Sequence, residues 1–270
     1  MRQRGLGGRS EPPRPPPVTP RMPYEGESAI ARFYDGDYAH FRTPSGDVAY
    51  YVDEAVRSGG PVLEFGCGTG RILIPTAEKG VAITGVDASE AMLAQLRAKM
   101  PRADVHKGDM RDFDAKRKFA LVTIPFRPIA HILDAEDHVR IFANMRRHLA
   151  PKGRMIFDFF HPKLEYLAAP RPEKLDFERI EGDRKIRRYS SAVPHASRQV
   201  NDVTLRWEVE DGEGRIEHSR TGFEMRWFYR FELEHILARA GLAVEALYGG
   251  FDRSALEDGS AEMIFVARAT

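Results

Sequence analysis

The sequence predicts an α/β fold: a doubly wound, mostly parallel sheet of seven strands that carries an inserted antiparallel β segment. From residue 45 to residue 160, short apolar runs alternate with stretches of helical spacing, the pattern of a parallel sheet covered by helices. The runs are apolar at nearly every position, as expected of strands buried on both faces. From Leu175 to Trp227 charged and apolar residues alternate with period two, which predicts antiparallel strands.

The first part of the core begins with a helix over residues 45–57, where Val48, Val52 and Ala55 fall on one helical face. A short apolar strand, Pro61–Phe65, then runs into the glycine-rich turn 66–70. The helix that follows contains Pro75, which predicts a bend or a poor first turn.

The same alternation continues to residue 160. Ser89 is a suitable N-cap for a helix over Glu90–Met100, and Pro101 ends that helix. Asp134 begins an amphipathic helix that the segment Pro151–Gly153 closes. Four further strands are predicted in this part, at residues 81–86, 104–106, 119–124 and 155–160.

The alternating segment predicts about three antiparallel strands, inserted over residues 173–227. Leu205, Trp207 and Val209 share one face of a strand, and Asp211–Gly214 is a turn signal. A core made of residues 24–172 and 228–270 is then completed by one helix and two strands, at Phe231–Ala240, Leu242–Tyr248 and Glu262–Ala267.

Composition narrows the protein class without indicating its chemistry. Of the 270 residues, 41 are Lys or Arg and 40 are Asp or Glu, so no strong basic field points to nucleic acid. The single cysteine, Cys67, excludes an intramolecular disulfide framework and a Cys-rich zinc site, and we expect no metal. No run reaches the ~18 apolar residues of a membrane helix. We therefore expect a cytoplasmic protein that does not bind a membrane.

The first 23 residues differ from the rest of the chain. They hold seven of the 18 prolines and carry a net charge of +4, which leaves −3 for the remainder. A segment so poor in apolar residues cannot offset the entropy of ordering, so we expect a disordered tail. Two interpretations stay open: Met22 is the natural start instead of Met1, or Pro12–Pro17 is a polyproline docking segment.

The strongest chemical signal is the glycine-rich turn Gly66-Cys67-Gly68-Thr69-Gly70 between a strand and a helix. Gly66 and Gly68 let a ligand approach the backbone, and the N–H groups at a helix start attract anionic groups. Asp87 follows at the end of the second strand, where an acidic residue binds a ribose diol. In dinucleotide-binding turns the third glycine comes one residue later, and here Glu64 precedes the first glycine by two residues.

These features resemble the class I S-adenosylmethionine-dependent methyltransferases, whose first motif is acid-x-Gly-x-Gly-x-Gly. The resemblance covers roughly Ala29–Ala269 and includes three further segments in the family's order: Val86-Asp87-Ala88-Ser89, Gly108-Asp109-Met110 and Thr123-Ile124-Pro125-Phe126. It implies a Rossmann-like fold, S-adenosylmethionine as cofactor and methyltransferase activity.

The resemblance also implies roles for single residues in cofactor binding. Gly66, Cys67 and Gly68 would surround the methionine end of the cofactor, and Glu64 would act on that end indirectly. Asp87 would hold the ribose, with Ala88 beside the adenine. Asp109 and Met110 would bind the adenine edge. Pro125 would lie where the methionine part meets the acceptor.

Three segments are candidates for contact with the methyl acceptor. Phe33–Arg42 resembles the N-terminal lid of small-molecule N-methyltransferases, and it supplies Tyr38 and Arg42 as candidates, with Tyr34 behind them. After the fourth strand, Arg127 would bind an anionic substrate and His131 would be a base. The antiparallel insert resembles the substrate cap of the same enzymes.

The predicted function is methyl transfer from S-adenosylmethionine to a small molecule by in-line displacement, with an amine acceptor favoured over oxygen. The catalytic candidates are His131, Tyr38 and Arg127. Alternatives are a protein or RNA methyltransferase, a nicotinamide-dependent oxidoreductase and a non-catalytic S-adenosylmethionine-binding module. Nucleic acid is a disfavoured partner, because the basic run Arg184–Arg188 fits a solvated strand face.

Overall fold

The computed structural model describes residues 29–41 and 46–270. The predicted disordered tail, both candidate start residues and the predicted site residue Arg42 lie outside the described residues. No helix in the described ranges is long and apolar enough to cross a membrane.

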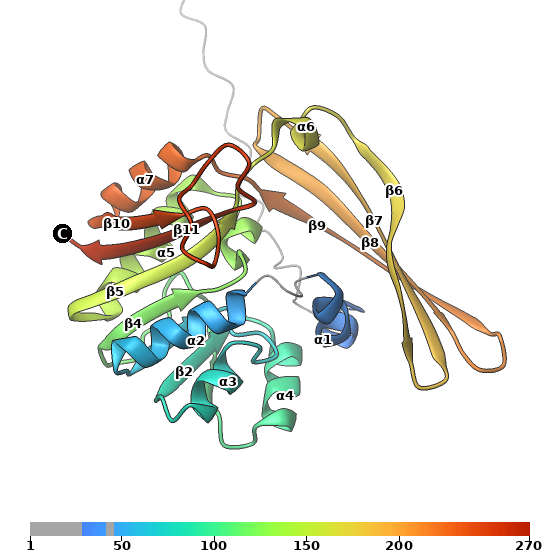
Figure 1. Ribbon diagram of the computed structural model, residues 1–270, viewed down its shortest axis with the longest axis horizontal. Coiled ribbons are helices and arrows are strands. Elements are labelled where there is room, and N and C mark those ends of the chain that lie inside the picture. The colour runs from blue at the N-terminus through green and yellow to red at the C-terminus, as the bar shows by residue number, and fades with distance from the viewer. Residues whose placement is uncertain (1–28, 42–45) are drawn as a thin grey trace, which may run out of the picture.

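The core is the predicted sheet of seven strands, in the order β10-β11-β5-β4-β1-β2-β3 (Figure 1). Only β11 runs against its neighbours, β10 and β5, and the other pairs are parallel. The doubly wound, mostly parallel fold is therefore confirmed. Its strands are β1 (Val62–Phe65), β2 (Ile83–Asp87), β3 (Asp104–Lys107), β4 (Phe119–Ile124), β5 (Leu149–Phe160), β10 (Leu242–Tyr248) and β11 (Glu262–Ala269).

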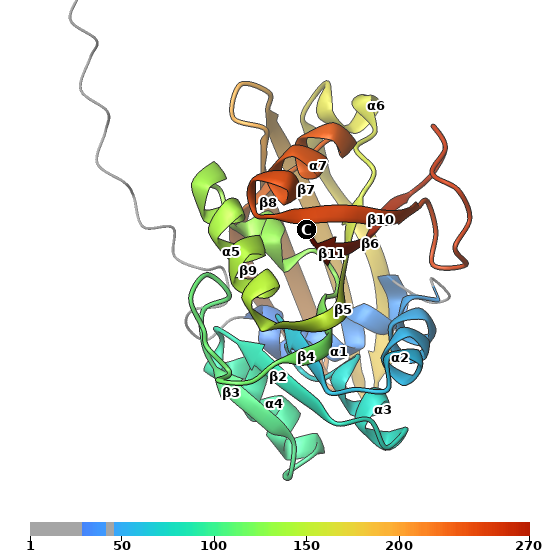
Figure 2. The same ribbon diagram turned by 90° about the vertical axis from the view of Figure 1, so that its left-hand side faces the viewer.

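Helices cover both faces of this sheet, because successive side chains of a strand point to opposite faces. Along β5, Met155 and Phe157 pack against helices α5 and α7, whereas Ile156 joins the cluster of α2, α3 and α4. Figure 2 shows α5 and α7 together on one side of the sheet and α2 with α3 on the other. The helices are α1 (Ala29–Phe41), α2 (Asp47–Ser58), α3 (Leu73–Glu78), α4 (Glu90–Lys99), the 3-10 turn η1 (Pro128–His131), α5 (Ala135–His148), α6 (Leu164–Leu167) and α7 (Arg230–Arg239).

Most predicted helix ends are confirmed at atomic detail. The Ser89 hydroxyl accepts the Met92 N–H at the start of α4, at 3.3 Å. The Asp134 carboxylate accepts the Glu136 and Asp137 N–H groups at the start of α5. Gly241 adopts a positive φ of 76° after α7. These caps satisfy backbone donors and acceptors that the helix itself leaves unpaired.

The inserted segment forms an antiparallel sheet of four strands, where the sequence predicted about three. This cap sheet has the order β6-β7-β8-β9 and stands apart from the core sheet in Figure 1. The missed strand is β6, an edge strand whose residues are mostly exposed, so it lacks the buried-exposed alternation that marks the others. The strands are β6 (Arg171–Glu181), β7 (Arg184–His195), β8 (Val200–Glu210) and β9 (Ile216–Arg226).

Two further elements differ from the prediction. The segment 33–41, treated as a lid before the first helix, belongs to helix α1, which packs Ile30 and Phe33 against Trp207 of the cap sheet. The fifth strand begins at Leu149, not at Met155. The segment Pro151–Gly153 is an irregularity inside that strand, where Lys152 has φ 65° and the pairing register with β4 shifts.

Candidate functional site

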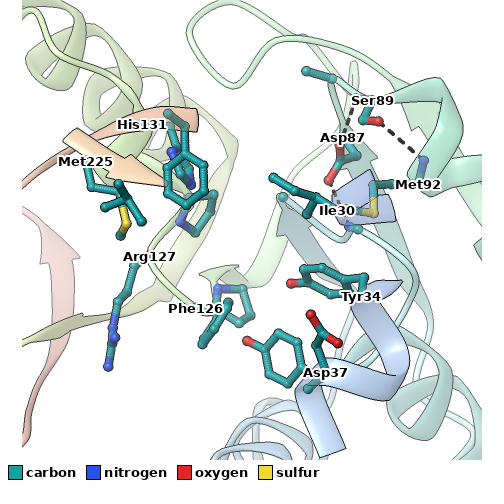
Figure 3. Close-up of a pocket in the computed structure, with 18 of the residues that line it drawn as sticks. Ile30, Tyr34, Asp37, Asp87, Ser89, Met92, Phe126, Arg127, His131 and Met225 are labelled. Carbon is teal, nitrogen blue, oxygen red and sulfur yellow. Dashed lines mark hydrogen bonds between the residues drawn. The ribbon is translucent and has the colours of Figure 1, made fainter. Parts of the chain in front are cut away.

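A cavity of about 590 Å³ lies between the carboxyl ends of the central parallel strands, helix α1 and the cap sheet (Figure 3). This is where open α/β sheets bind ligands. The predicted site residues that line it are Tyr38, Gly66, Gly68, Asp87, Ala88, Asp109, Met110, Pro125, Arg127 and His131. Cys67 and Glu64 lie behind the lining, and Arg42 lies outside the described residues.

The glycine-rich turn brings backbone close to the cavity. Gly66 has φ 70°, and a Cβ there would lie 2.7 Å from Pro128 Cγ, so both conformation and space favour glycine. The Gly66 N–H donates to the Val86 carbonyl at 2.7 Å and anchors the turn to β2. The turn therefore has a fixed shape in the part that faces the cavity.

Asp87 links the turn to the start of α4. One carboxylate oxygen accepts the Gly68 N–H and the other accepts the Ser89 N–H, each at 2.8 Å. Burial raises the pKa of the Asp87 carboxyl, although these backbone hydrogen bonds act in the opposite direction. Each oxygen has a second lone pair, so the carboxylate can hold the turn and also accept ligand hydroxyls.

Asp109 is held by its neighbour Arg111. The guanidinium donates to both carboxylate oxygens, with Nε at 3.0 Å from each, and also pairs with Asp137. Burial acts to raise the pKa of Asp109, but the Arg111 hydrogen bonds outweigh it and the pKa lies below its usual value. Beside it, the Met110 carbonyl accepts the Asn144 side chain at 3.0 Å. Both residues are therefore fixed at the cavity wall.

Behind the turn, Glu64 and Cys67 are buried. Burial raises the pKa of Glu64 to about 8, with Arg71 as the cation that opposes this rise. Burial also raises the pKa of the Cys67 thiol well above its usual value, so the sulfur is uncharged at neutral pH. The Cys67 side chain packs against Gly85 of β2 and not into the cavity. These properties do not fit a nucleophilic thiol.

Arg71 is a residue that sequence reasoning missed, although it directly follows the glycine-rich turn. Its guanidinium pairs with Asp47 at 2.7 Å and lies 4.2 Å from the centre of the Tyr38 ring. It also faces Glu64 electrostatically. Arg71 is thus the basic side chain through which Glu64 can act on the turn.

Tyr38 belongs to a group of aromatic rings on the cavity wall. Its ring centre lies 4.9 Å from that of Tyr34 and 4.3 Å from that of Phe126. On the same helix, Asp35 accepts the Thr69 hydroxyl of the glycine-rich turn at 2.6 Å. Helix α1 therefore contacts the turn and supplies part of the cavity wall.

The turn after β4 presents Arg127 and His131 to the cavity. Phe126 and Arg127 both have φ 63°, which is unusual for residues other than glycine. The Asp158 carboxylate holds this turn by accepting the Phe126 N–H at 2.7 Å. The Arg127 guanidinium is paired with Glu262 at 2.5 Å, so it faces the cavity as part of an ion pair.

His131 is buried beside the cap sheet. Its ring packs edge-on against Phe223, at 5.2 Å between centres, and its Nδ1 lies 3.4 Å from the Glu224 carbonyl. Burial lowers the pKa of His131 to about 4. At neutral pH the imidazole is therefore uncharged and can accept a hydrogen bond, but it is a weak base.

The cap half of the cavity wall was largely missed. Met225, His131 and Arg127 lie on one side of the cavity in Figure 3, opposite Ile30, Tyr34 and Asp37. Three side chains where the insert meets the core, those of His161, Arg226 and Trp227, are not among the lining residues. The residues of α1 and the cap sheet that line the cavity are Ile30, Tyr34, Asp37, Tyr38, Arg171, Arg188, Ser190, Val203, Leu205, Trp207, Phe223 and Met225.

The parallel sheet, its glycine-rich turn and Asp87 define a class I nucleotide-binding site of the methyltransferase type. Comparisons with known proteins agree: residues 62–153 match the model of a methyltransferase domain. The dTDP-4-amino-2,3,4,6-tetradeoxy-D-glucose N,N-dimethyltransferase of Saccharopolyspora spinosa is 30% identical over 206 residues, 76% of this chain and 80% of the relative. The chain belongs to the S-adenosylmethionine-dependent methyltransferases.

Two further matches extend over most of the chain. The dTDP-3-amino-3,6-dideoxy-alpha-D-glucopyranose N,N-dimethyltransferase of Streptomyces fradiae is 28% identical, covering 86% of this chain and 89% of the relative. The structure of S-adenosylmethionine-bound CalS10, an amino pentose methyltransferase from Micromonospora echinaspora, matches with a TM-score of 0.72. That match has 25% identity and covers 91% of this chain and all of the other. The predictions of cofactor and enzyme class are confirmed, and the oxidoreductase and binding-module alternatives are not favoured.

Proposed function

We propose that the protein methylates the amino group of an amino sugar or a closely similar small amine. The observation that carries this proposal is the single cavity that extends from Gly66 and Asp87 to the cap sheet. Apolar side chains form much of its cap half, including Val203, Phe223 and Met225. The names of the relatives, which are amino sugar N,N-dimethyltransferases, support the same acceptor class.

When bound, S-adenosylmethionine supplies a methyl group on a sulfonium. The residues present fit this cofactor, because Asp87 keeps lone pairs for a ribose diol at the cavity wall, directly beside the glycine-rich turn. We assign the adenine edge to Asp109 and Met110, with Ala88 beside it. Gly66, Gly68 and the Cys67 backbone would surround the methionine end, with Glu64 acting through Arg71.

On the acceptor side, the chain's main task is alignment and exclusion of water. We assign Tyr38, with Pro125 near it, to the junction of cofactor and acceptor. The neutral imidazole of His131 would orient the acceptor by accepting a hydrogen bond. Arg127, paired with Glu262, would offer both a donor and an acceptor to the same molecule.

The location of the cavity between the core and the cap sheet supports the domain assignment made from the sequence. In this proposal residues 24–172 and 228–270 bind the cofactor, and residues 173–227 cap the acceptor. A cap sheet over the acceptor end favours a small molecule over a protein or RNA strand. We also propose that the enzyme works in the cytoplasm.

Two measurements test this proposal. Calorimetry should show binding of S-adenosylmethionine and S-adenosylhomocysteine. Mass spectrometry should show one or two methyl groups added to dTDP-3-amino-3,6-dideoxy-α-D-glucopyranose, or to another member of a panel of dTDP-linked and free amino sugars. Hydroxy analogues of the same sugars serve as controls. Cofactor binding without methylation of any amine, or methylation of the hydroxy analogues alone, overturns the proposal.

A further inference from the structure

Asp37 is a buried carboxylate on the cavity wall with no role in the site described above. It projects from α1 beside Tyr34 (Figure 3), and only 5% of the residue is exposed. One oxygen accepts the Trp207 indole N–H at 2.9 Å and lies 3.3 Å from Arg188. The other lies 3.5 Å from Arg179 and has no hydrogen-bond partner among the described residues.

The arginines beside Asp37 are shared with other carboxylates. Arg188 also pairs with Asp176 at 3.3 Å, and Arg179 also pairs with Glu181. Glu181 is half exposed, so the buried groups Asp37, Asp176, Arg179 and Arg188 balance in formal charge. Within this balanced group, one Asp37 oxygen still has no hydrogen-bond partner among the described residues.

The local backbone is adapted to this cluster. A Cβ on Gly36 would lie 2.5 Å from the Arg179 guanidinium carbon, so a larger residue there would displace this guanidinium from its present position. On the β7 side, Ser190 donates to Asp176 at 2.7 Å and lines the cavity. The cluster is therefore an ordered part of the cavity wall.

The surroundings of Asp37 suit a cationic nitrogen. Two tyrosines of α1 line the cavity beside Asp37: Tyr34, three residues before it, and Tyr38, one residue after it. Trp207 is a third aromatic side chain at the cap end of the cavity. Aromatic rings attract ammonium groups through their negative faces. The Asp37 oxygen without a hydrogen bond can accept one from an N–H group of a ligand. Leaving a buried oxygen without a hydrogen bond costs free energy.

We propose that Asp37 is the binding group for the acceptor's amine, and that it takes a proton from the ammonium form before methyl transfer. This inference rests on the proposed function. The ammonium N–H bond breaks, the proton moves to an Asp37 oxygen, and the electron pair stays on nitrogen. That pair then forms the N–C bond as the C–S bond of the sulfonium breaks, and its electrons remain on sulfur. When the methylammonium product leaves, the Asp37 proton passes to solvent.

Several charged and titratable groups surround Asp37: Tyr34 and Tyr38 of α1, Arg179 with Asp176 and Glu181 of β6, and Arg188 of β7. Burial raises the pKa of the Asp37 carboxyl, and the Trp207 and arginine contacts oppose that rise. A carboxyl with a raised pKa is better matched to accepting a proton from an amine. The proton transfer neutralises both the ammonium group and the Asp37 carboxylate.

The test is the pH profile of kcat/KM for the Asp37→Asn variant, with the amino sugar found to be methylated by the wild type. At a pH below the amine's own pKa, activity should fall about 100-fold or more, since the acceptor arrives as ammonium. The deficit should shrink as pH rises through that pKa, because the amine is then already neutral. A deficit of equal size at every pH overturns the proposal.

The matched control is Glu217→Gln. It removes another ion pair between α1 and the cap sheet, with exposed Arg32, and does not touch the cavity. This variant should keep both the activity and the pH profile of the wild type. If Glu217→Gln shows the same pH-dependent loss, α1 docking explains the effect and the proposal fails.

Two additional measurements keep the test decisive. If Asp37→Asn does not fold, the variants Asp37→Glu and Asp37→Gln replace it. The Asp37→Glu variant should retain activity at low pH, and the Asp37→Gln variant should not. Equal loss of activity in both variants contradicts the proposal. Calorimetry with S-adenosylhomocysteine should give an unchanged affinity in each folded variant. A wild type that methylates no amine refutes the proposed function itself, whereas a pH-independent Asp37→Asn deficit refutes only the role of Asp37.

Discussion

Replacing Asp87 by asparagine tests the cofactor site most directly, because the substitution keeps shape while changing charge and one acceptor. In the structure the two carboxylate oxygens accept the Gly68 and Ser89 N–H groups. An asparagine keeps one acceptor oxygen and turns an NH₂ group toward the other N–H. The variant therefore loses one hydrogen bond to the turn and one to the ribose.

The expected loss follows from the strength of these bonds. The bond to the turn is present with and without the cofactor, so only the ribose bond enters the binding free energy, and a hydrogen bond to a charged group contributes about 1.5–3 kcal/mol. At about 1.4 kcal/mol per factor of ten, the Kd for S-adenosylmethionine should rise about 10- to 100-fold. The carboxylate is buried, so solvent does not screen this effect strongly.

Isothermal titration calorimetry with S-adenosylmethionine and S-adenosylhomocysteine measures this change, and thermal unfolding checks that the variant folds. The control is Glu90→Gln, at the exposed start of α4, where the side chain pairs with Arg97. Its affinity should match the wild type. A folded Asp87→Asn protein with an affinity within about threefold of the wild type would refute the ribose assignment.

Three other predictions address protonation, charge and packing. The pKa of His131 is lowered from 6.5 to about 4 in the folded protein. Between these pH values the unfolded chain binds a proton that the folded protein does not, so the free energy of unfolding should fall as the pH drops. His131→Gln should reduce this pH dependence in thermal unfolding, and an unchanged pH dependence contradicts the prediction. Arg71→Met removes the cation facing Glu64 and should weaken S-adenosylmethionine binding about tenfold by calorimetry, whereas equal binding excludes Arg71 from cofactor positioning. Phe142→Ala, at a fully buried position, should cost about 3–5 kcal/mol in denaturant unfolding, and a loss below about 1 kcal/mol contradicts tight packing there.

The residues that we assign to the cofactor could be placed on one cavity wall from the sequence because their signals are local. The glycine-rich turn and Asp87 each lie at the end of a strand that is visible as an apolar run, and the Asp109–Met110 pair follows the short polar strand β3. Parallel strands then bring their carboxyl ends to one edge of the sheet. The proximity of these residues therefore follows from the parallel strands alone and does not depend on the rest of the fold.

The cap half could not be predicted because its contacts depend on tertiary register. Arg188 and Trp207 meet through the pairing of β7 with β8, and both then meet Asp37, more than 150 residues earlier in the chain. Helix α1 was missed for a similar reason. The sequence Asp35-Gly36-Asp37 has low helix propensity, and the helix is stabilised by the packing of Phe33 on Trp207, with ring centres 5.3 Å apart.

In helix α1, neighbouring residues contact both the glycine-rich turn and the cap sheet. Asp35 bonds to the cofactor turn through Thr69, and Asp37 bonds to the cap sheet through Trp207. The cap sheet itself is one continuous stretch of chain, from Arg171 to Arg226. In the proposed function, exchange of that stretch between relatives should change the acceptor range and leave the methyl donor unchanged. Such a chimera has to keep the α1 residues around Gly36 matched to the exchanged sheet, because this part of the helix packs against Arg179 of β6.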